Sequence, residues 1–255
     1  MFKLGLKLWS INKNYIKEAI RLYDNNVYDY IELFIVPNTD KSYLHIWRKL
    51  EIPFIIHAPH YAFGLNLAQK ENSKNNIKLA KEAIEFSNKL NSSTIIFHPG
   101  TEGNIIETIR QIKLINDPRI IIENKPYYAL PKFGNGKLIC NGYSPNDIKK
   151  IMNESGVGFC FDIGHATCAA NAQKIDRLEY IKEFLKLNPK MYHISDGNFH
   201  GIYDEHKHLG YGTFPLKKLL RIIPQNSMIS IETEKSSQEN LNDFEEDIRN
   251  ISQFV

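Results

Sequence analysis

The segment TIIFHPG, residues 94–100, joins a short apolar run to a histidine, a proline and a glycine. An apolar run of this length, bounded by turn residues, is typical of a buried strand in a parallel sheet. His98 then lies at the carboxyl end of that strand. A polar group in this place is costly unless it has a partner, so the segment predicts a strand that ends in a binding residue.

Five other apolar runs along the chain end in the same way. They are FIIHAP at 54–59, RIIIENK at 119–125, FCFDIGH at 159–165, MYHISDG at 191–197 and ISIETEK at 229–235. Together with the loop YDEHKHLGYG at 203–212 they supply nine residues that can bind a metal, namely His57, His98, Glu123, Asp162, His165, His193, Asp204, His206 and Glu232. A ring of parallel strands brings its carboxyl ends together, so we expect these residues to form one rim.

The fold expected from this pattern is an α/β, single (β/α)8 TIM barrel that uses residues 1–255 as one domain. Strands are expected at about 2–9, 29–36, 53–57, 94–98, 119–123, 157–162, 190–194 and 228–232, and helices at about 12–25, 40–50, 72–91, 103–116, 145–155, 171–187, 215–222 and 237–252. The length agrees with the roughly 250 residues of such barrels. The alternative is an open doubly wound sheet, which would spread the strand ends along a line.

Composition excludes several classes of protein. The net charge of +3 is weak evidence for nucleic-acid binding. Three cysteines without a C-x-x-C pair argue against a disulfide framework or a thiolate zinc site. The alternating start MFKLGLKLWS differs from a secretory leader, and no run approaches the roughly 18 apolar residues of a membrane span. We therefore expect a cytoplasmic protein without a membrane partner.

The donor set of the rim is nitrogen and oxygen, which favours Zn, Mn, Fe(II) or Co over Ca. Its five imidazoles make magnesium alone a poor fit, and nine ligands exceed the needs of one ion, so two or three ions are expected. Other roles remain open at this point. His98 could be structural, Asp162 could cap a helix, and Asp204 and His206 could be ordinary loop residues.

Two long loops, at about 125–143 and 195–214, follow strands and should cover the rim. The candidate substrate contacts near them and near the strand ends are Glu32, His60, Tyr61, Lys125, Tyr127 and His208. Glu32 could equally be a buried carboxylate paired with a lysine, and the loop histidines could be solvated.

The motifs HAP, HPG, IEN, DIGHA, HISD and DEHKHLGYG, in this order, resemble those of the xylose isomerase-like TIM barrels over essentially the whole chain. Within that group the chain resembles both endonuclease IV and the sugar phosphate isomerase/epimerase-like proteins. The first resemblance implies up to three zinc ions. The ligand sets would be His57, His98 and Glu123; then Glu123, Asp162, His193 and Glu232; and finally His165, Asp204 and His206.

Several departures separate the chain from endonuclease IV. D-I-G-H replaces D-T-C-H, Glu205 replaces an arginine in D-E-H, and FIVPNTDKS stands where the arginine-bearing DNA-contact loop would be. A binder of the phosphate backbone should present cationic groups on its open face.

Three functions follow from the resemblance. The first is a metal-dependent isomerase or epimerase of a small sugar or sugar phosphate derivative, with Zn or Mn as the expected cofactor. The resemblance implies that Glu123, Asp162, His193 and Glu232 hold the essential ion and that Glu123 and Glu232 also transfer the proton. The second, with DNA as a less favoured partner, is a zinc-dependent endonuclease at abasic sites. The third is a metal-binding barrel without catalysis.

Overall fold

Eight parallel strands close into a barrel in the computed structural model, which describes residues 1–131 and 137–254. The strands are β1 (Lys3–Trp9), β2 (Tyr30–Phe34), β3 (Phe54–His57), β4 (Ile95–Phe97), β5 (Ile120–Glu123), β6 (Gly158–Asp162), β7 (Met191–Ile194) and β8 (Met228–Ile231). Each pairs with the next in the chain, and β8 pairs with β1 in the register Leu6↔Ile231. This closure confirms the barrel and excludes the open sheet.

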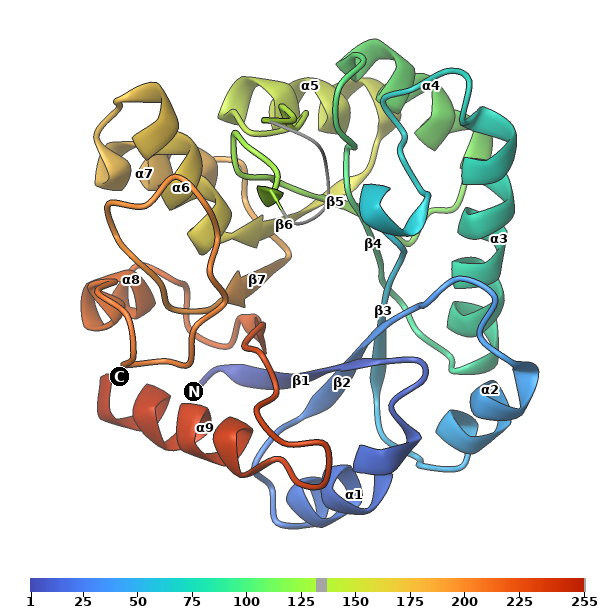
Figure 1. The fold of residues 1–255 in the computed structure, drawn as a ribbon, viewed down its shortest axis with the longest axis vertical. Helices are drawn as coiled ribbons and strands as arrows, with labels where there is room; N and C mark the ends of the chain where they lie inside the picture. Colours follow the sequence, from blue (N-terminus) through green and yellow to red (C-terminus); the bar gives the residue numbers. More distant parts are fainter. Residues whose placement is uncertain (132–136, 255) are drawn as a thin grey trace.

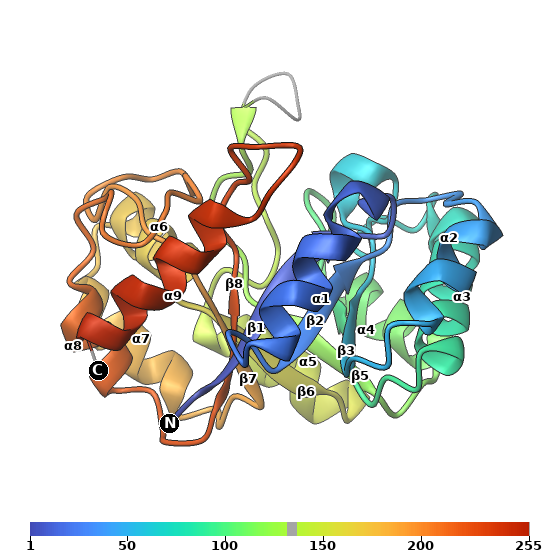
Figure 2. The same ribbon diagram turned by 90° about the horizontal axis from the view of Figure 1, so that it is seen from below.

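The helices surround the strands (Figure 1). They are α1 (Ile16–Asp24), α2 (Lys41–Arg48), α3 (Ser73–Lys89), α4 (Ile105–Ile115), α5 (Pro145–Ser155), α6 (Ile163–Gln173), α7 (Arg177–Leu185), α8 (Leu216–Arg221) and α9 (Asn242–Phe254), with short 3-10 helices at Lys13–Tyr15 and Tyr61–Phe63. Figure 2 shows α1 and α9 side by side on the outside of β1 and β8, as expected from the closure of the ring. Among the described residues, no helix combines the length and the apolar character needed to cross a membrane.

Alternate residues of each strand serve two different cores. One set, including Leu6, Ile31 and Ile95, packs between the strands and the helices. The other set fills the inside of the barrel and consists of Tyr30, Ile55, Ile96, Ile121, Cys160 and Met191. We call this second set the lower layer. A side chain at Gly5 would come within 2.4 Å of the Tyr30 ring, so the close approach of the two strands requires glycine there.

The lower layer explains the position of the polar rim. Two residues further along each strand, the inward position carries a polar side chain, as in Glu32, His57, Glu123 and His193. Along one strand, the inward-facing side chains therefore change from apolar in the lower layer to ionisable two residues later. We call this second level the upper layer.

One predicted helix is wrong. The segment 171–187 contains the end of α6 and all of α7 rather than one helix. The Asp162 side chain accepts a hydrogen bond from the His165 backbone N–H at 2.6 Å, so α6 begins directly at the end of β6. Lys174 then adopts a left-handed conformation with φ 58°, and Asp176 caps α7.

The last helix begins later than predicted, at Asn242 instead of about 237. The backbone carbonyls of Ser237 and Gln238 accept hydrogen bonds from Tyr15 and Asn14. These hydrogen bonds hold the segment before α9 against the connection between β1 and α1. Part of the predicted loop 125–143, residues 132–136, lies outside the described residues.

Candidate metal centre

A cavity of about 490 Å³ opens at the carboxyl ends of the strands. Side chains of seven of the nine predicted ligands line it, namely His57, His98, Glu123, His165, Asp204, His206 and Glu232. Asp162 and His193, which are also buried, are absent from the described residues that line it. Lys125, Ala129 and Leu130 show that the first long loop forms part of its wall.

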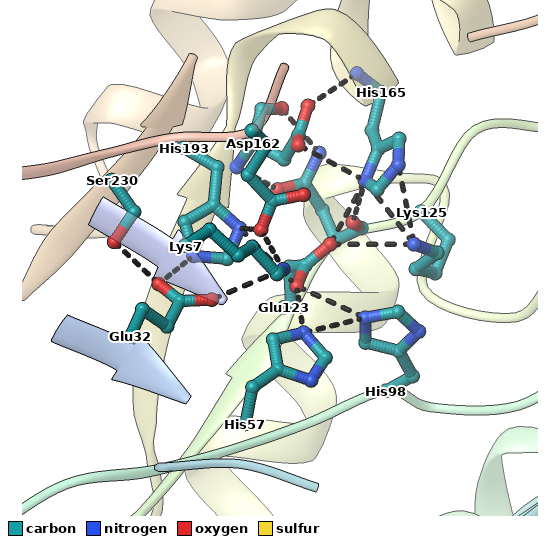
Figure 3. A network of polar contacts seen from close by, with 12 residues as sticks. Lys7, Glu32, His57, His98, Glu123, Lys125, Asp162, His165, His193 and Ser230 are labelled. Atoms are coloured by element: carbon teal, nitrogen blue, oxygen red, sulfur yellow. Dashed lines mark hydrogen bonds and ion pairs between the residues drawn. The ribbon is translucent and has the colours of Figure 1, made fainter. Parts of the chain in front are cut away.

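His57, His98 and Glu123 form one compact candidate site, which we call the first group (Figure 3). The Nε2 atoms of both histidines lie 3.2 Å apart, and each is within 3.2 Å of Oε2 of Glu123. Nδ1 of His57 lies 2.8 Å from the Ala58 carbonyl, which favours a proton on Nδ1 and leaves the Nε2 lone pair facing the group. Two such nitrogens beside one carboxylate oxygen suit a shared cation.

His165, Asp204 and His206 form a second compact site, the second group. Oδ2 of Asp204 lies 3.3 Å from Nε2 of His165 and 2.6 Å from Nε2 of His206. Nδ1 of His206 lies 2.7 Å from the backbone carbonyl of Glu232, so this ring too is oriented from behind by a backbone acceptor. The positive φ of His206, 49°, turns the loop so that its side chain reaches Asp204.

Glu123, Asp162, His193 and Glu232, which we call the inner set, lie at the centre of the rim and belong to three overlapping close groups. The close groups place Glu123 with Asp162 and His165, Glu123 with Cys160 and His193, and His193 and Glu232 with Glu32. His193 joins the last two, because its Nδ1 is 2.8 Å from Glu232 and 3.4 Å from Glu123. The rim therefore has two compact outer groups, with the inner set of overlapping ligands between them.

Lys7 is the residue of this region that the sequence patterns did not indicate. Its Nζ lies 3.1 Å from Oε1 of Glu32 and also pairs with Oε1 of Glu232. Burial by itself lowers the pKa of Lys7, but Glu232, Glu32 and Glu123 outweigh it and raise that pKa above the ordinary value. Lys7 is therefore an ammonium group inside the barrel.

Two buried atoms support a fit between these residues and a metal ion. Nδ1 of His193 and Oδ2 of Asp204 have no hydrogen-bond partner among the described residues, although other ligand atoms lie close to them. Burial lowers the pKa of His165 and His206, but Asp162 beside His165 and Asp204 beside His206 reverse the effect and raise these pKa values to about 10 and about 9. The local field thus favours positive charge.

Burial alone raises the pKa of Glu123, but His98, Lys125 and His193 hold it well below the usual range. Glu123 is therefore an ionised carboxylate at the centre of the network. Cys160 lies beneath it, close to His193, and burial raises the pKa of its thiol to about 12. The three cysteines are free and buried, as expected for reduced thiols.

The predicted substrate contacts have different surroundings. His60, Tyr61 and Lys125 line the cavity, with Nζ of Lys125 3.3 Å from Glu123. Glu32 is fully buried and binds Lys7 and Nε2 of His193, as in the paired-carboxylate alternative. The cavity wall, as far as it is described, does not include Tyr127 or His208.

Tyr127 packs on Tyr143 with ring centroids 4.7 Å apart. Nδ1 of His208 lies 2.9 Å from Asp247 of α9. Neither placement favours a substrate contact, and both residues help to hold the loops that cover the cavity.

Asp196 holds the loop that carries Asp204 and His206. Its buried carboxylate accepts backbone hydrogen bonds from Gly197, Gly210, Gly212 and Phe214 at 2.7 to 3.1 Å. A side chain at Gly212 would come within 2.2 Å of this carboxylate. The motifs HISDG and LGYG are thus two halves of one loop anchor, a link that spacing alone does not reveal.

Comparisons with known proteins agree with this architecture. The family model described as xylose isomerase-like TIM barrel matches residues 28–254. An uncharacterised protein of Methanocaldococcus jannaschii is 23% identical over 217 residues, covering 78% of this chain and 70% of its own. A D-tagatose 3-epimerase-like protein has a TM-score of 0.74 at 20% identity, over 99% of this chain and 97% of that one. Endonuclease IV from Thermus thermophilus has a TM-score of 0.71 at 17% identity, over 99% and 98%.

Proposed function

Because the chain belongs to the xylose isomerase-like TIM-barrel family, we propose that it is a divalent-metal-dependent isomerase or epimerase of a sugar or sugar phosphate derivative. The observation that carries the proposal is the cavity of about 490 Å³, which contains candidate metal ligands together with Glu232 and Lys7. Pockets for small molecules commonly measure about 300–1,000 Å³. A cavity of this size suits one sugar.

The inner set and the first and second groups are the candidate metal sites, with zinc or manganese as the best match to their imidazole and carboxylate donors. A bound divalent ion would act as a Lewis acid toward an oxygen of the substrate. Glu123, as part of the first group and 3.0 Å from His165, links the two sites.

Glu232 is the candidate proton-transfer residue of the cavity. Burial raises its pKa, but His193 and Lys7 outweigh burial and keep that pKa well below the usual range, so the group is a carboxylate that can accept a proton. Lys7 adjoins it and can donate a hydrogen bond to an oxygen on which negative charge develops. Trp9 and Phe34, with ring centroids 5.6 Å apart, offer an apolar wall for the carbon face of a sugar.

The second group is the observation that favours an abasic-site endonuclease as the other candidate, since the resemblance assigns its third ion to these residues. The cationic groups weigh against it. The described residues that line the cavity include Lys7, Lys125 and Lys235 but no arginine, the usual bidentate partner of phosphate.

A solvent-exchange assay tests the proposal. The zinc- or manganese-loaded protein is incubated in D₂O with a panel of ketoses, aldoses and their phosphates, and deuterium incorporation is followed by NMR. We expect metal-dependent exchange next to the carbonyl carbon of at least one sugar. Glu232→Gln should slow it by about 100-fold or more, the scale of general acid–base catalysis. Glu239→Gln, the same change at an exposed position, should leave it unchanged.

A duplex containing an abasic site provides the contrasting assay. Binding should be weak at physiological salt and incision absent or slow. Efficient metal-dependent incision without exchange on the sugar panel would replace the proposal with the endonuclease.

A further inference from the structure

We infer that the substrate carries an anionic group, a phosphate or a carboxylate, and that Lys235 binds this group at the outer end of the cavity. The inference rests on the proposed function, because it assumes that the cavity binds a sugar derivative. It adds the chemical class of the substituent and the side chain that selects it. Lys235 belongs to none of the candidate metal-ligand sets, so the inference does not depend on how many ions the rim holds.

Lys235 offers the cavity a positive charge that the protein itself does not neutralise. The side chain is half-buried and lines the cavity wall. Its Nζ donates one hydrogen bond, to the Thr233 carbonyl at 2.9 Å, and lies 5.9 Å from the centroid of the Phe244 ring. Glu234 also lines the cavity, but neither it nor any other carboxylate of the described chain forms an ion pair with Lys235. An ammonium group has three N–H donors, so two of them remain for a ligand.

The acidic residues of α9 that face Lys235 hold the backbone on either side of it. Oδ2 of Asp243 accepts hydrogen bonds from the backbone N–H and the hydroxyl of Ser236 at 2.7 and 3.0 Å. Oδ2 of Asp247 accepts one from Oγ1 of Thr233 at 2.7 Å. Burial lowers the pKa of Lys235, and these two carboxylates offset that effect only in part. A bound anion would stabilise the ammonium directly.

A second connection of the barrel contributes amide groups to the same wall. Asn12 and Gln238 both line the cavity. Oδ1 of Asn12 accepts a hydrogen bond from the backbone N–H of Trp9 at 2.7 Å, so Nδ2 is the amide atom that faces a ligand. The connections that carry Asn12 and Gln238 contact each other, because Nδ2 of Asn14 donates to the Gln238 carbonyl at 2.7 Å (Figure 1). The wall beside Lys235 thus offers N–H donors, which suit an anionic oxygen.

The order of residues along β1 and β8 places this wall beyond the reacting end of the cavity. The two strands are neighbours in the barrel. Outward from the candidate metal centre, β8 and its connection carry Glu232 and then Lys235, while β1 carries Lys7 and then Trp9. A sugar whose reacting carbon lies at Glu232 would lay its carbon face on Trp9, which is 43% exposed, and place its far end at Lys235. The connections after the last strands of such barrels are a frequent site of phosphate binding.

Calorimetric binding to the zinc-loaded protein tests the inference with sugars that differ at one carbon. Glucose, glucose 6-phosphate and glucuronate form one such set, and ribulose with ribulose 5-phosphate forms another. We expect an anionic member of at least one set to bind about 10-fold or more tightly than its neutral counterpart, the scale of a hydrogen bond to a charged group. Lys235→Met should lower the affinity for that anionic sugar by about the same factor and leave the neutral sugar unchanged. Lys149→Met, the same change at an exposed position of α5, should alter neither.

Further variants attribute the change to the ammonium group. Zinc content should be the same in the wild type and in Lys235→Met. Lys235→Arg keeps the charge and should retain the tight binding of the anionic sugar, and Lys235→Gln serves as the neutral variant if Lys235→Met does not fold. The larger effect, on the phosphate or on the carboxylate, identifies the anion. A wild type that binds anionic and neutral sugars equally, or binds neither, would overturn the inference, as would tight anion binding that survives in folded Lys235→Met.

These measurements do not use turnover, so the inference and the proposed function fail separately. Deuterium exchange into a neutral sugar, with no effect of Lys235→Met on any anionic sugar, would keep the proposed function and reject the anion site. Lys235-dependent binding of an anionic sugar, without exchange on the sugar panel, would keep the anion site and reject the proposed function.

Discussion

The inside of the barrel has two layers that share the same strands and differ in chemistry. The lower layer contains the apolar side chains of Ile55, Ile96 and Ile121, together with Tyr30. The upper layer, two residues further along each strand, contains His57, His98 and Glu123. Apolar burial in the lower layer stabilises the closed ring, and that ring holds charged groups of the upper layer at distances they would not adopt in water. The fold and the metal centre therefore come from successive inward positions of the same strands.

Ile96→Ala should give the largest change in stability and the least change in the upper layer. Ile96 is fully buried, and removing such a side chain typically lowers the free energy of unfolding by about 2–5 kcal/mol. Urea unfolding of the metal-free protein measures this loss. Zinc content should stay at the wild-type value, and Ile106→Ala, at an exposed position of α4, is the control. Loss of zinc in folded Ile96→Ala would show that the layers are not separable.

Glu123→Gln should give the converse result, with its main effect on zinc binding rather than on stability. Glu123 lies 3.0 to 3.3 Å from His57, His98, His165 and Lys125, so its carboxylate is common to most of the network. Loss of an outer partner of a ligand already costs about 10–100-fold in metal affinity, so loss of this carboxylate should weaken zinc binding by at least about 100-fold. Competition with a zinc chelator measures the change, with the exposed Glu179→Gln as control. Unaltered affinity would remove Glu123 from the first group.

How far the sequence predicts these layers depends on the kind of signal. All eight strands are predicted, because each is an apolar or alternating run and six of them end in a polar side chain. The two compact groups follow from the meeting of strand ends, but their separation from the inner set does not, since it depends on the directions of His193 and Glu232.

Lys7 escapes prediction for a physical reason. In the alternating strand KLGLKLW a lysine is typical of a solvent-facing position, and only ring closure turns that face inward. The sequence does not predict the break between α6 and α7, because the break occurs at Lys174 and lysine seldom adopts a positive φ. The role of Asp196 is not predicted because three of its four hydrogen-bond partners lie 14 to 18 residues away, across a loop.

Asp196→Asn should give the smallest of these effects and should be confined to one side of the rim. An amide oxygen cannot replace both carboxylate oxygens that accept the four backbone N–H groups, and each unmet donor costs about 1–3 kcal/mol. The loop that carries Asp204 and His206 should loosen. We expect weaker zinc binding at the second group with the first group unchanged, measured by titration calorimetry. The exposed Asp24→Asn is the control, and equal weakening at both groups would show that Asp196 acts on the whole barrel.

The claim that the upper layer is a metal centre is tested most directly by anomalous diffraction at the zinc absorption edge, from crystals of the zinc-loaded protein. The account predicts at least one strong peak among the ligands of the rim. The peaks should lie in the inner set, in the first group of His57, His98 and Glu123, or in the second group of His165, Asp204 and His206. The absence of a peak from the cavity would contradict the metal centre. Peaks that lie only outside these three sets would contradict the assignment of the ligands.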